Sequence, residues 1–317
     1  MSTEIRSNNK INEMINTKEI PPRNGNPLEV FKVADAVNAD EAVSKNQLTN
    51  SNFGFKNYII NGGFDVWQRG TSFSENGRVN NYNADRWRSE GYPQTTTNIT
   101  KTTLGYNNAI SYNIVTSASN GKNSLVQRIE NVIGLSGKTV TYSGKIKGDG
   151  NFNISIEIDG VAETFAVTTS EQKFSITTTL GNTTAQSYIT TRFVFASGTT
   201  GTIIVSQVQL EEGSVATPFE QRPYGLELSL CQRYYQRVLS SVRSYASGSS
   251  QYFNSSTTYM TEMRDTPTVT NLTNTSNNTS GNYIFGVTKT GFRHEIVSNG
   301  AGDCYSLDQL IELDAEL

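Results

Sequence analysis

The sequence has little of what catalytic and metal sites are usually built from. One histidine, His294, and two cysteines, Cys231 and Cys304, stand among 317 residues. A Ser-His-Asp or Cys-His site would have to use that histidine, and a zinc site rich in histidine is excluded within one chain. Neither cysteine belongs to a CxxC pair, so we expect two free thiols that act as small hydrophobic side chains.

Charge and long apolar runs are also scarce. Charged residues make up 17% of the chain and the net charge is -3, which provides no basic surface to release counterions from phosphates. No stretch of about 18 consecutive apolar residues occurs, and the opening MSTEIRSNNKINEM lacks the apolar core of a signal peptide. We therefore expect synthesis in a cytoplasm, no membrane insertion and no nucleic-acid partner.

What the sequence has in quantity is typical of strands and turns. Aromatic residues are 10%, and 26 glycines stand against 7 prolines, while the polarity comes from uncharged Ser, Thr and Asn. A disordered chain reaches such polarity through charge, with few aromatics. Thr, Tyr, Phe and Gly at low charge instead favour β-strands joined by tight turns.

Apolar side chains alternate with polar ones in many short segments after Asn57. In residues 152–158, Phe and three Ile alternate with polar residues and Asp159-Gly160 follows at once, which predicts a strand entering a hairpin turn. Other alternating sets are Ile110-Tyr112-Ile114, Val140-Tyr142, Phe174-Ile176, Phe193-Phe195, and Ile204 with Val208 and Leu210. At least about eight such strands without long helices between them predict an antiparallel sandwich or jelly roll.

The alternating strands predict an all-β fold class, and the breaks between them divide the chain into four parts. The expected parts are an extended or helical N-terminal arm for attachment or oligomerisation (1–50), an antiparallel jelly-roll β-sandwich (51–222), a short connecting helix (223–239) and a smaller C-terminal β tip domain (240–317).

Three segments near the C-terminal end carry more local predictions. In GLELSLCQRYYQRV (225–238), Leu226, Leu230, Cys231 and Tyr234 recur at three-to-four spacing and predict a helix with one apolar stripe. The tract TNLTNTSNNTSG (270–281) can bury almost nothing and is expected to be a solvent-facing loop. The apolar ending YSLDQLIELDAEL is expected to be a final strand in the last sheet.

Several of these segments resemble one protein family. NYIINGGFDVWQRG (57–70) with YNADRW (82–87) is similar to the opening of a jelly-roll module in bacteriophage tail fibres and related tail-associated adhesins, and VSQVQLEEGSVATPFEQRP (205–223) is similar to its end. LCQRYYQRV (230–238) and MRDTPTV (263–269) resemble the following terminal domain, and AVNADEAVSKNQL (36–48) resembles a unit that precedes the folded head. The resemblance spans about residues 36 to 317, and it includes no long β-helix of the depolymerising kind.

The resemblance implies a structural and adhesive virion protein, a tail fibre or tail-tip subunit made in the bacterial host cytoplasm. It implies a homotrimer that joins other virion tail or neck proteins through residues 1–50 and binds host surface polysaccharide multivalently through a carbohydrate-binding-like module. A purely architectural fibre, collar or head-decoration subunit without sugar binding is the alternative, and a glycan-cleaving enzyme is a further one. The lone histidine and the lack of a visible acidic pair favour a protein that is not an enzyme.

Aromatic residues are the candidate site residues. Tyrosines beside Gly, Pro, Ser and Asn present a ring and a hydroxyl together, as adaptable recognition surfaces do, although cross-strand or inter-subunit packing is the alternative role. The candidates for glycan contact are Tyr92, Tyr106, Tyr245, Tyr252 and Tyr259. Trp67 and Trp87 follow apolar strand residues and are expected to anchor the core rather than to form a sugar platform.

Four carboxylates raise two further possibilities. Asp65, Asp85, Glu211 and Glu212 lie near the two ends of the module and supply hard oxygen atoms of the kind that calcium prefers. No contiguous Asp-x-Asp-x-Asp-Gly loop is present, so we expect no cofactor and no catalytic or metal residues, with a structural calcium as the alternative. Asp85 and Arg86 are expected to be hydrogen-bonded structural charges.

Overall fold

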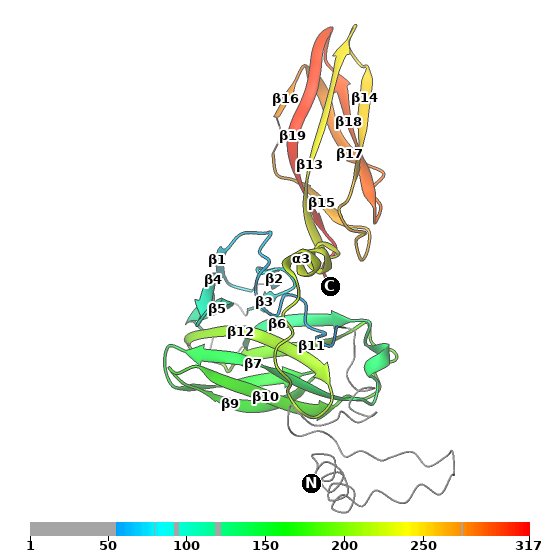
Figure 1. Ribbon diagram of the computed structural model, residues 1–317. Coiled ribbons are helices and arrows are strands. Elements are labelled where there is room, and N and C mark those ends of the chain that lie inside the picture. Colours follow the sequence, from blue (N-terminus) through cyan, green and yellow to red (C-terminus); the bar gives the residue numbers. More distant parts are fainter. Residues whose placement is uncertain (1–54, 79, 92–94, 118–121, 274) are drawn as a thin grey trace, which may run out of the picture. The chain divides into compact units, whose positions relative to one another are not determined.

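The computed structural model describes residues 55–317 except 79, 92–94, 118–121 and 274 (Figure 1). The expected arm, residues 1–50, its unit at 36–48 and the candidate Tyr92 lie outside the described residues. Within that part, nearly all regular structure is antiparallel β-sheet, with α-helix α3 (Tyr224–Gln232) and a short 3-10 helix (Val132–Leu135). The predicted all-β fold class is therefore confirmed.

Two antiparallel sheets, each of six strands in the described part of the chain, form a jelly-roll sandwich (Figure 1). The first runs in the order β1 (Ser72–Asn76), β4 (Thr96–Leu104), β5 (Asn107–Thr116), β12 (Gly201–Glu212), β7 (Thr139–Gly148), β10 (Gln172–Thr179). The second runs in the order β2 (Asn80–Tyr82), β3 (Arg88–Glu90), β6 (Asn123–Glu130), β11 (Tyr188–Phe195), β8 (Phe152–Ile158), β9 (Val161–Val167). The chain changes sheet at most of the connections between successive strands, so neighbouring strands such as β5 and β12 are distant in sequence.

The hairpin predicted after residue 158 is present. Strand β8 pairs with β9 so that Ile158 faces Val161, and the two residues between them, Asp159 and Gly160, have φ of 46° and 86°. Two successive positive φ angles are what a two-residue hairpin turn needs to match the twist of its strands. Ile154, Ile156 and Ile158 are buried, which confirms the face predicted for this strand.

Aromatic rings fill the centre of the jelly roll. Trp87 is fully buried and its ring centroid lies 5.0 Å from that of Phe64. Phe193 contacts Phe174 edge-on at 5.4 Å and Tyr142 at 5.7 Å. Offset and edge-on pairs of this kind add about 0.5–1.5 kcal/mol each beyond the area that they bury, so these rings fix how the two sheets pack.

A β-bulge in β12 changes which side chains enter this core. Gln207 has a φ of 53°, and the register between β12 and β7 shifts between Ser206 and Gln209. The apolar residues that β12 adds to this core are therefore Ile203 and Val205 before the bulge and Val208 and Leu210 after it. The prediction that Ile204 shares a face with Val208 and Leu210 was wrong, because an extra residue reverses a two-residue alternation.

The opening segment, residues 57–62, lies along this bulged strand. The Tyr58 amide donates to the Leu210 carbonyl at 2.8 Å, and the Val208 amide donates to the Gly62 carbonyl at 2.9 Å. At Gly62 a Cβ atom would lie 2.0 Å from the Val208 carbonyl oxygen. Only glycine lets the two backbones approach this closely, which explains the first glycine of the opening motif.

The substitution Gly62→Ala should destabilise the protein. Because the clash is with backbone, relief requires the opening segment to move off β12, and we expect a loss of about 3 kcal/mol in the free energy of unfolding. Gly150→Ala is the control, since a Cβ there meets nothing within 4 Å. Urea unfolding measures both, and equal stabilities of the two variants would contradict this description of the opening segment.

Helix α3 is shorter than predicted. It ends at Gln232, and β13 begins at Tyr235, so the prediction of helix through residue 238 was wrong. The Ala315 amide donates to the Tyr234 carbonyl at 2.8 Å, and this pairing with the end of the chain draws the segment into a sheet. The helix buries Glu227 and Cys231. No helix in the described residues is long and apolar enough to cross a membrane.

A second, smaller sandwich follows the helix. One sheet contains β13 (Tyr235–Ala246), β19 (Gly302–Asp314), β15 (Thr268–Asn271) and β16 (Thr275–Asn277), with the last two both paired to β19. The other runs in the order β14 (Tyr252–Thr258), β18 (Gly291–Ser298), β17 (Thr279–Phe285). Two small clusters centred on Ile311 and on Ile296 fill its interior.

The C-terminal strand pairs with strands on both of its sides, and the polar tract at 270–281 contributes to strands. Strand β19 pairs with β13 on one side and with β15 and β16 on the other, which confirms the predicted final strand. Most of residues 270–281 lie in β15, β16 and β17, so the loop prediction was wrong. Exposed threonines suit an edge strand whose backbone bonds to β19.

Both cysteines and the single histidine are buried. Cys231 and Cys304 are free and buried, as predicted. His294 is fully buried and lies 2.8 Å from Asn282 Oδ1 through Nε2 and 3.0 Å from Ser240 Oγ through Nδ1. Because the Asn282 oxygen only accepts, Nε2 carries the proton and Nδ1 accepts from Ser240. Burial lowers the pKa of His294, which favours the neutral ring.

His294 should therefore titrate below its ordinary value of 6.5. A pKa that is lower in the folded state contributes stability above the unfolded value, and this contribution is lost as the pH falls through the folded pKa. Since the chain has one histidine, its imidazole proton resonance is unambiguous in an NMR titration. A midpoint at or above 6.5 would contradict the buried, neutral ring.

Candidate functional site

The outer face of the β14, β18 and β17 sheet gathers aromatic, amide and charged side chains. Alternate residues of a strand point to opposite faces, and His294 and Phe292 are buried on the inner side. The outer residues form rows set by strand register, and these are Tyr252-Val297-Gly281, Asn254-Glu295-Tyr283 and Ser256-Arg293-Phe285. We call this surface the outer tip face.

Two tyrosines form the aromatic end of the outer tip face. Tyr252 is 65% exposed and Tyr283 is 53% exposed. A Cβ at Gly281 would lie 2.4 Å from the Tyr283 ring, so that ring occupies the space above Gly281. Because Gly281 and Tyr252 flank Val297 in one row, the rings of both tyrosines border the same apolar spot.

The next two rows supply polar groups. Asn254 and Tyr283 lie opposite Glu295 on either side of it, which places amide, carboxylate and phenol groups in one row. In the third row the Arg293 guanidinium lies 5.2 Å from the centre of the Phe285 ring. A cation beside an aromatic ring is attracted by its π-electrons, by about 0.5–1 kcal/mol at exposed sites, so Phe285 helps to hold the guanidinium in place.

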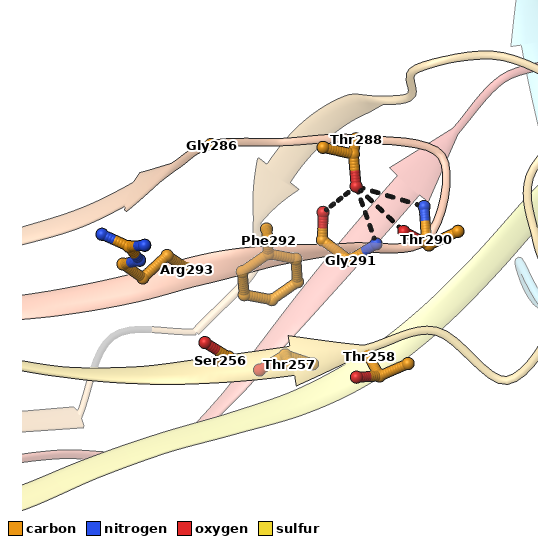
Figure 2. A pocket seen from close by; sticks show the side chains of 9 residues that line it. All are labelled: Ser256, Thr257, Thr258, Gly286, Thr288, Thr290, Gly291, Phe292 and Arg293. Carbon is orange, nitrogen blue, oxygen red and sulfur yellow. Dashed lines mark hydrogen bonds between the residues drawn. The ribbon is translucent and has the colours of Figure 1, made fainter.

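A hollow of about 290 Å³ lies at the turn end of the outer tip face (Figure 2). Figure 2 shows Ser256 and Thr258 on one strand, Arg293 on the next, and Thr288 and Thr290 in the turn between β17 and β18. Thr288 Oγ1 accepts from the Gly291 amide at 3.2 Å and donates to the Gly291 carbonyl at 3.0 Å. These bonds fix the turn, so the hydroxyl groups that line the hollow stand on a rigid frame.

This arrangement has the chemistry of a sugar-binding surface. The C–H faces of a sugar ring pack on aromatic rings, while its hydroxyl groups bond to amide, carboxylate and guanidinium groups. The outer tip face offers all of these within three rows, and strands spaced about 4.8 Å apart hold them at fixed separations. His294 is buried on the opposite side of the sheet and does not reach this face.

The candidate tyrosines do not lie together. Tyr252 belongs to the outer tip face, whereas Tyr245 is exposed on β13 of the other sheet and Tyr106 is exposed in the turn between β4 and β5. Tyr259 is 7% exposed, and its ring centroid lies 6.1 Å from that of Phe292. A ring packed in this way has no face free for a sugar, so Tyr259 is not part of the site. Tyr92 is outside the described residues.

The two tryptophans lie in the jelly roll. Trp87 is fully buried, and its indole N–H donates to the Asn61 carbonyl at 3.0 Å. Trp67 is partly buried against the core, and its N–H donates to the Phe64 carbonyl at 2.8 Å. Both rings therefore support the packing of the opening segment and neither forms an open platform.

Sequence reasoning missed Tyr283, Phe285 and Arg293. Tyr283 and Phe285 follow the tract at 270–281 and belong to a segment that the sequence predicts as a strand, but the sequence does not show which of its two faces points outward. The signal that finds them is the alternation of Gly281, Tyr283 and Phe285 with Asn282 and Ile284. This alternation becomes informative once the segment is recognised as a strand beside β18.

The four carboxylates considered for calcium lie in separate surroundings. Asp85 accepts from the Gln68 backbone and side-chain amides at 2.6 and 2.7 Å, and Asp65 accepts from Asn108 at 2.6 Å. Glu211 accepts from Thr217, and Glu212 accepts from the Tyr58 hydroxyl at 2.7 Å. Among the described residues no three His, Cys, Asp or Glu side chains gather as a metal site would need.

Buried charges join the jelly roll to the ends of the second sandwich. Arg86 is 1% exposed, forms an ion pair with Glu316, and lies 3.5 Å from the centre of the Tyr234 ring. Burial raises the pKa of Glu316, and Arg86 and Arg69 oppose that rise by favouring the carboxylate. Nearby, Glu130 accepts from Arg264 at 2.8 Å and from the Tyr234 hydroxyl at 2.7 Å. Arg86 is thus a structural charge.

Comparisons with known proteins give weak resemblances of fold. No protein-family model and no curated protein matches the sequence. Among solved structures, a family 4 carbohydrate-binding module is 22% identical, covers 49% of this chain and 99% of its own, and gives a TM-score of 0.32. A family 11 carbohydrate-binding module from Clostridium thermocellum, solved with a mixed-linked tetrasaccharide, is 13% identical over 46% of this chain and 98% of its own, with a TM-score of 0.33.

A third similar structure has a different activity. A cyclase from Fischerella sp. TAU is 10% identical, covers 52% of this chain and 100% of its own, and gives a TM-score of 0.36. Each match spans about half of this chain, and similarity at this level carries no argument about what the chain binds.

Proposed function

We propose that this chain is an adhesive subunit of a bacteriophage tail fibre or tail tip, and that the outer tip face binds host surface glycan. The observation that carries the proposal is the cross-strand register of that face. It places Tyr252 and Tyr283 at one apolar spot beside amide, carboxylate and guanidinium groups. The motif resemblance supplies the viral setting. On this proposal the protein is not an enzyme, because the face offers groups for binding and none arranged for bond cleavage.

Binding on an open, three-stranded face would be weak at each site. A flat surface buries only part of a sugar, so useful affinity needs several copies that bind together. A homotrimer, displayed on several fibres per particle, would supply these copies, with residues 1–50 joining it to other tail or neck proteins. A purely architectural subunit is the second candidate, favoured by the closely packed jelly roll and distinguished by an absence of glycan binding.

Loss of either tyrosine ring should weaken glycan binding. We expect Tyr252→Ala and Tyr283→Ala each to weaken binding about tenfold, which corresponds to about 1.4 kcal/mol, because each removes an exposed aromatic face. Gly281→Ala should weaken binding as well, because the new methyl group displaces the Tyr283 ring. A glycan array of bacterial surface polysaccharides, followed by titration of the strongest binder with the full chain, measures these effects.

Matched controls come from the same protein. Tyr106→Ala removes an exposed tyrosine of the jelly roll, and Gly248→Ala adds a methyl group where nothing lies within 4 Å. These variants should bind as the parent does. Failure of the parent to bind any glycan at fibre-like valency would favour the architectural subunit, and loss of binding in Tyr106→Ala alone would move the site to the jelly roll.

The proposed homotrimer predicts a molar mass in solution three times that of the chain. Exposed apolar side chains on β13, including Leu239 at 64% exposure, are the kind of surface that sister copies cover. Size-exclusion chromatography with light scattering measures the mass. A monomer that persists at high protein concentration would count against the fibre subunit.

A further inference from the structure

Arg293 differs from the other outward-facing arginines of the second sandwich. On β13, Arg237 pairs with Glu312 and Arg243 pairs with Asp303, each at 2.6 Å. Among the described residues, no carboxylate lies within ion-pair distance of Arg293, and its cross-strand neighbours are Ser256 and Phe285. The guanidinium is therefore exposed, oriented by an aromatic ring and not neutralised by the fold.

The hollow beside Arg293 is lined by positive charge and by no negative charge among the described residues. Its other described lining residues are Ser, Thr, Gly and Phe, so Arg293 is the one charged side chain among them. Glu295 lies two residues further along β18, about 7 Å away at the usual rise of a strand, and does not line the hollow. Ser256, Thr258 and Thr290 also line the hollow, and their hydroxyl groups can both donate and accept hydrogen bonds.

We propose that this hollow takes the anionic group of an acidic sugar residue, with Arg293 as its binding partner. A guanidinium presents two parallel N–H groups that match the two oxygens of a carboxylate or of a phosphate. Because the arginine already lacks a carboxylate partner, no ion pair has to break before the ligand binds. This inference rests on the proposed function of the outer tip face and adds the class of glycan that the face selects.

The test uses the full chain and four polymers that carry matched sugars at equal density. These carry glucose, glucuronate, the methyl ester of glucuronate, and glucose 6-phosphate. At low salt we expect the parent to bind at least one of the two charged polymers, glucuronate or glucose 6-phosphate, about tenfold more tightly than the glucose and methyl ester polymers. This preference should shrink at high salt, because salt screens the charges. Comparison of the glucuronate and phosphate polymers identifies which anion is preferred.

Variants decide whether Arg293 is responsible. Arg293→Gln should remove the preference for charged polymers, and Arg293→Lys should restore part of it. Arg78→Gln, which removes an exposed arginine of the jelly roll, should leave it unchanged. Equal binding of charged and neutral polymers by the parent, no binding to any of the four, or an unchanged preference in Arg293→Gln would overturn the inference.

The outcome separates this inference from the proposed function. If neutral glycans on the array bind in a manner that depends on Tyr252 and Tyr283 while Arg293→Gln has no effect, the glycan face stands and the acidic selectivity falls. If neither the array nor any polymer binds, both fall.

Discussion

A buried arginine–carboxylate pair holds together the segments on which the rest of the fold depends. Arg222 is 5% exposed and bonds to Glu227 at 3.2 Å and to the Ile59 carbonyl at 3.1 Å, while Glu227 accepts from the Asn61 amide. The opening segment, the end of the jelly roll and α3 therefore share one pair. Removing one partner of such a pair typically costs 3–5 kcal/mol, because the other charge stays buried. Arg86 and Glu316 form a second buried ion pair, just after the end of β19.

These contacts explain what the opening motif contributes to the fold. Asn57, Asn61, Gly62 and Trp87 occupy positions where a side-chain bond or a close backbone approach permits little else. The motifs are thus constraints on folding, and they contain none of the residues of the outer tip face. Tyr252 and Tyr283 on that face are exposed, so packing of the core does not dictate them.

The sequence predicted those parts of the fold that a local pattern determines. Alternation and a turn pair identified β8 and its hairpin, because both signals lie within ten or so residues. The bulge at Gln207 depends on contact with Gly62, which is far away in sequence, so alternation alone placed Ile204 on the wrong face. The end of α3 likewise depends on pairing with Ala315. Among the candidate site residues, Tyr252 is exposed whereas Tyr259 is buried against Phe292. This difference cannot be read from the neighbours of either tyrosine in sequence, because Phe292 is distant in sequence.

In the proposed function, a sugar lies against β14, β18 and β17. Selective labelling of the tyrosine rings, followed by NMR titration with an oligosaccharide that the chain binds, observes this contact directly. The account predicts that the resonances of Tyr252 and Tyr283 shift and show cross-peaks to sugar protons, while those of Tyr106 and Tyr245 do not change. Cross-peaks from the sugar to Tyr106, or to Tyr245 without Tyr283, would contradict it.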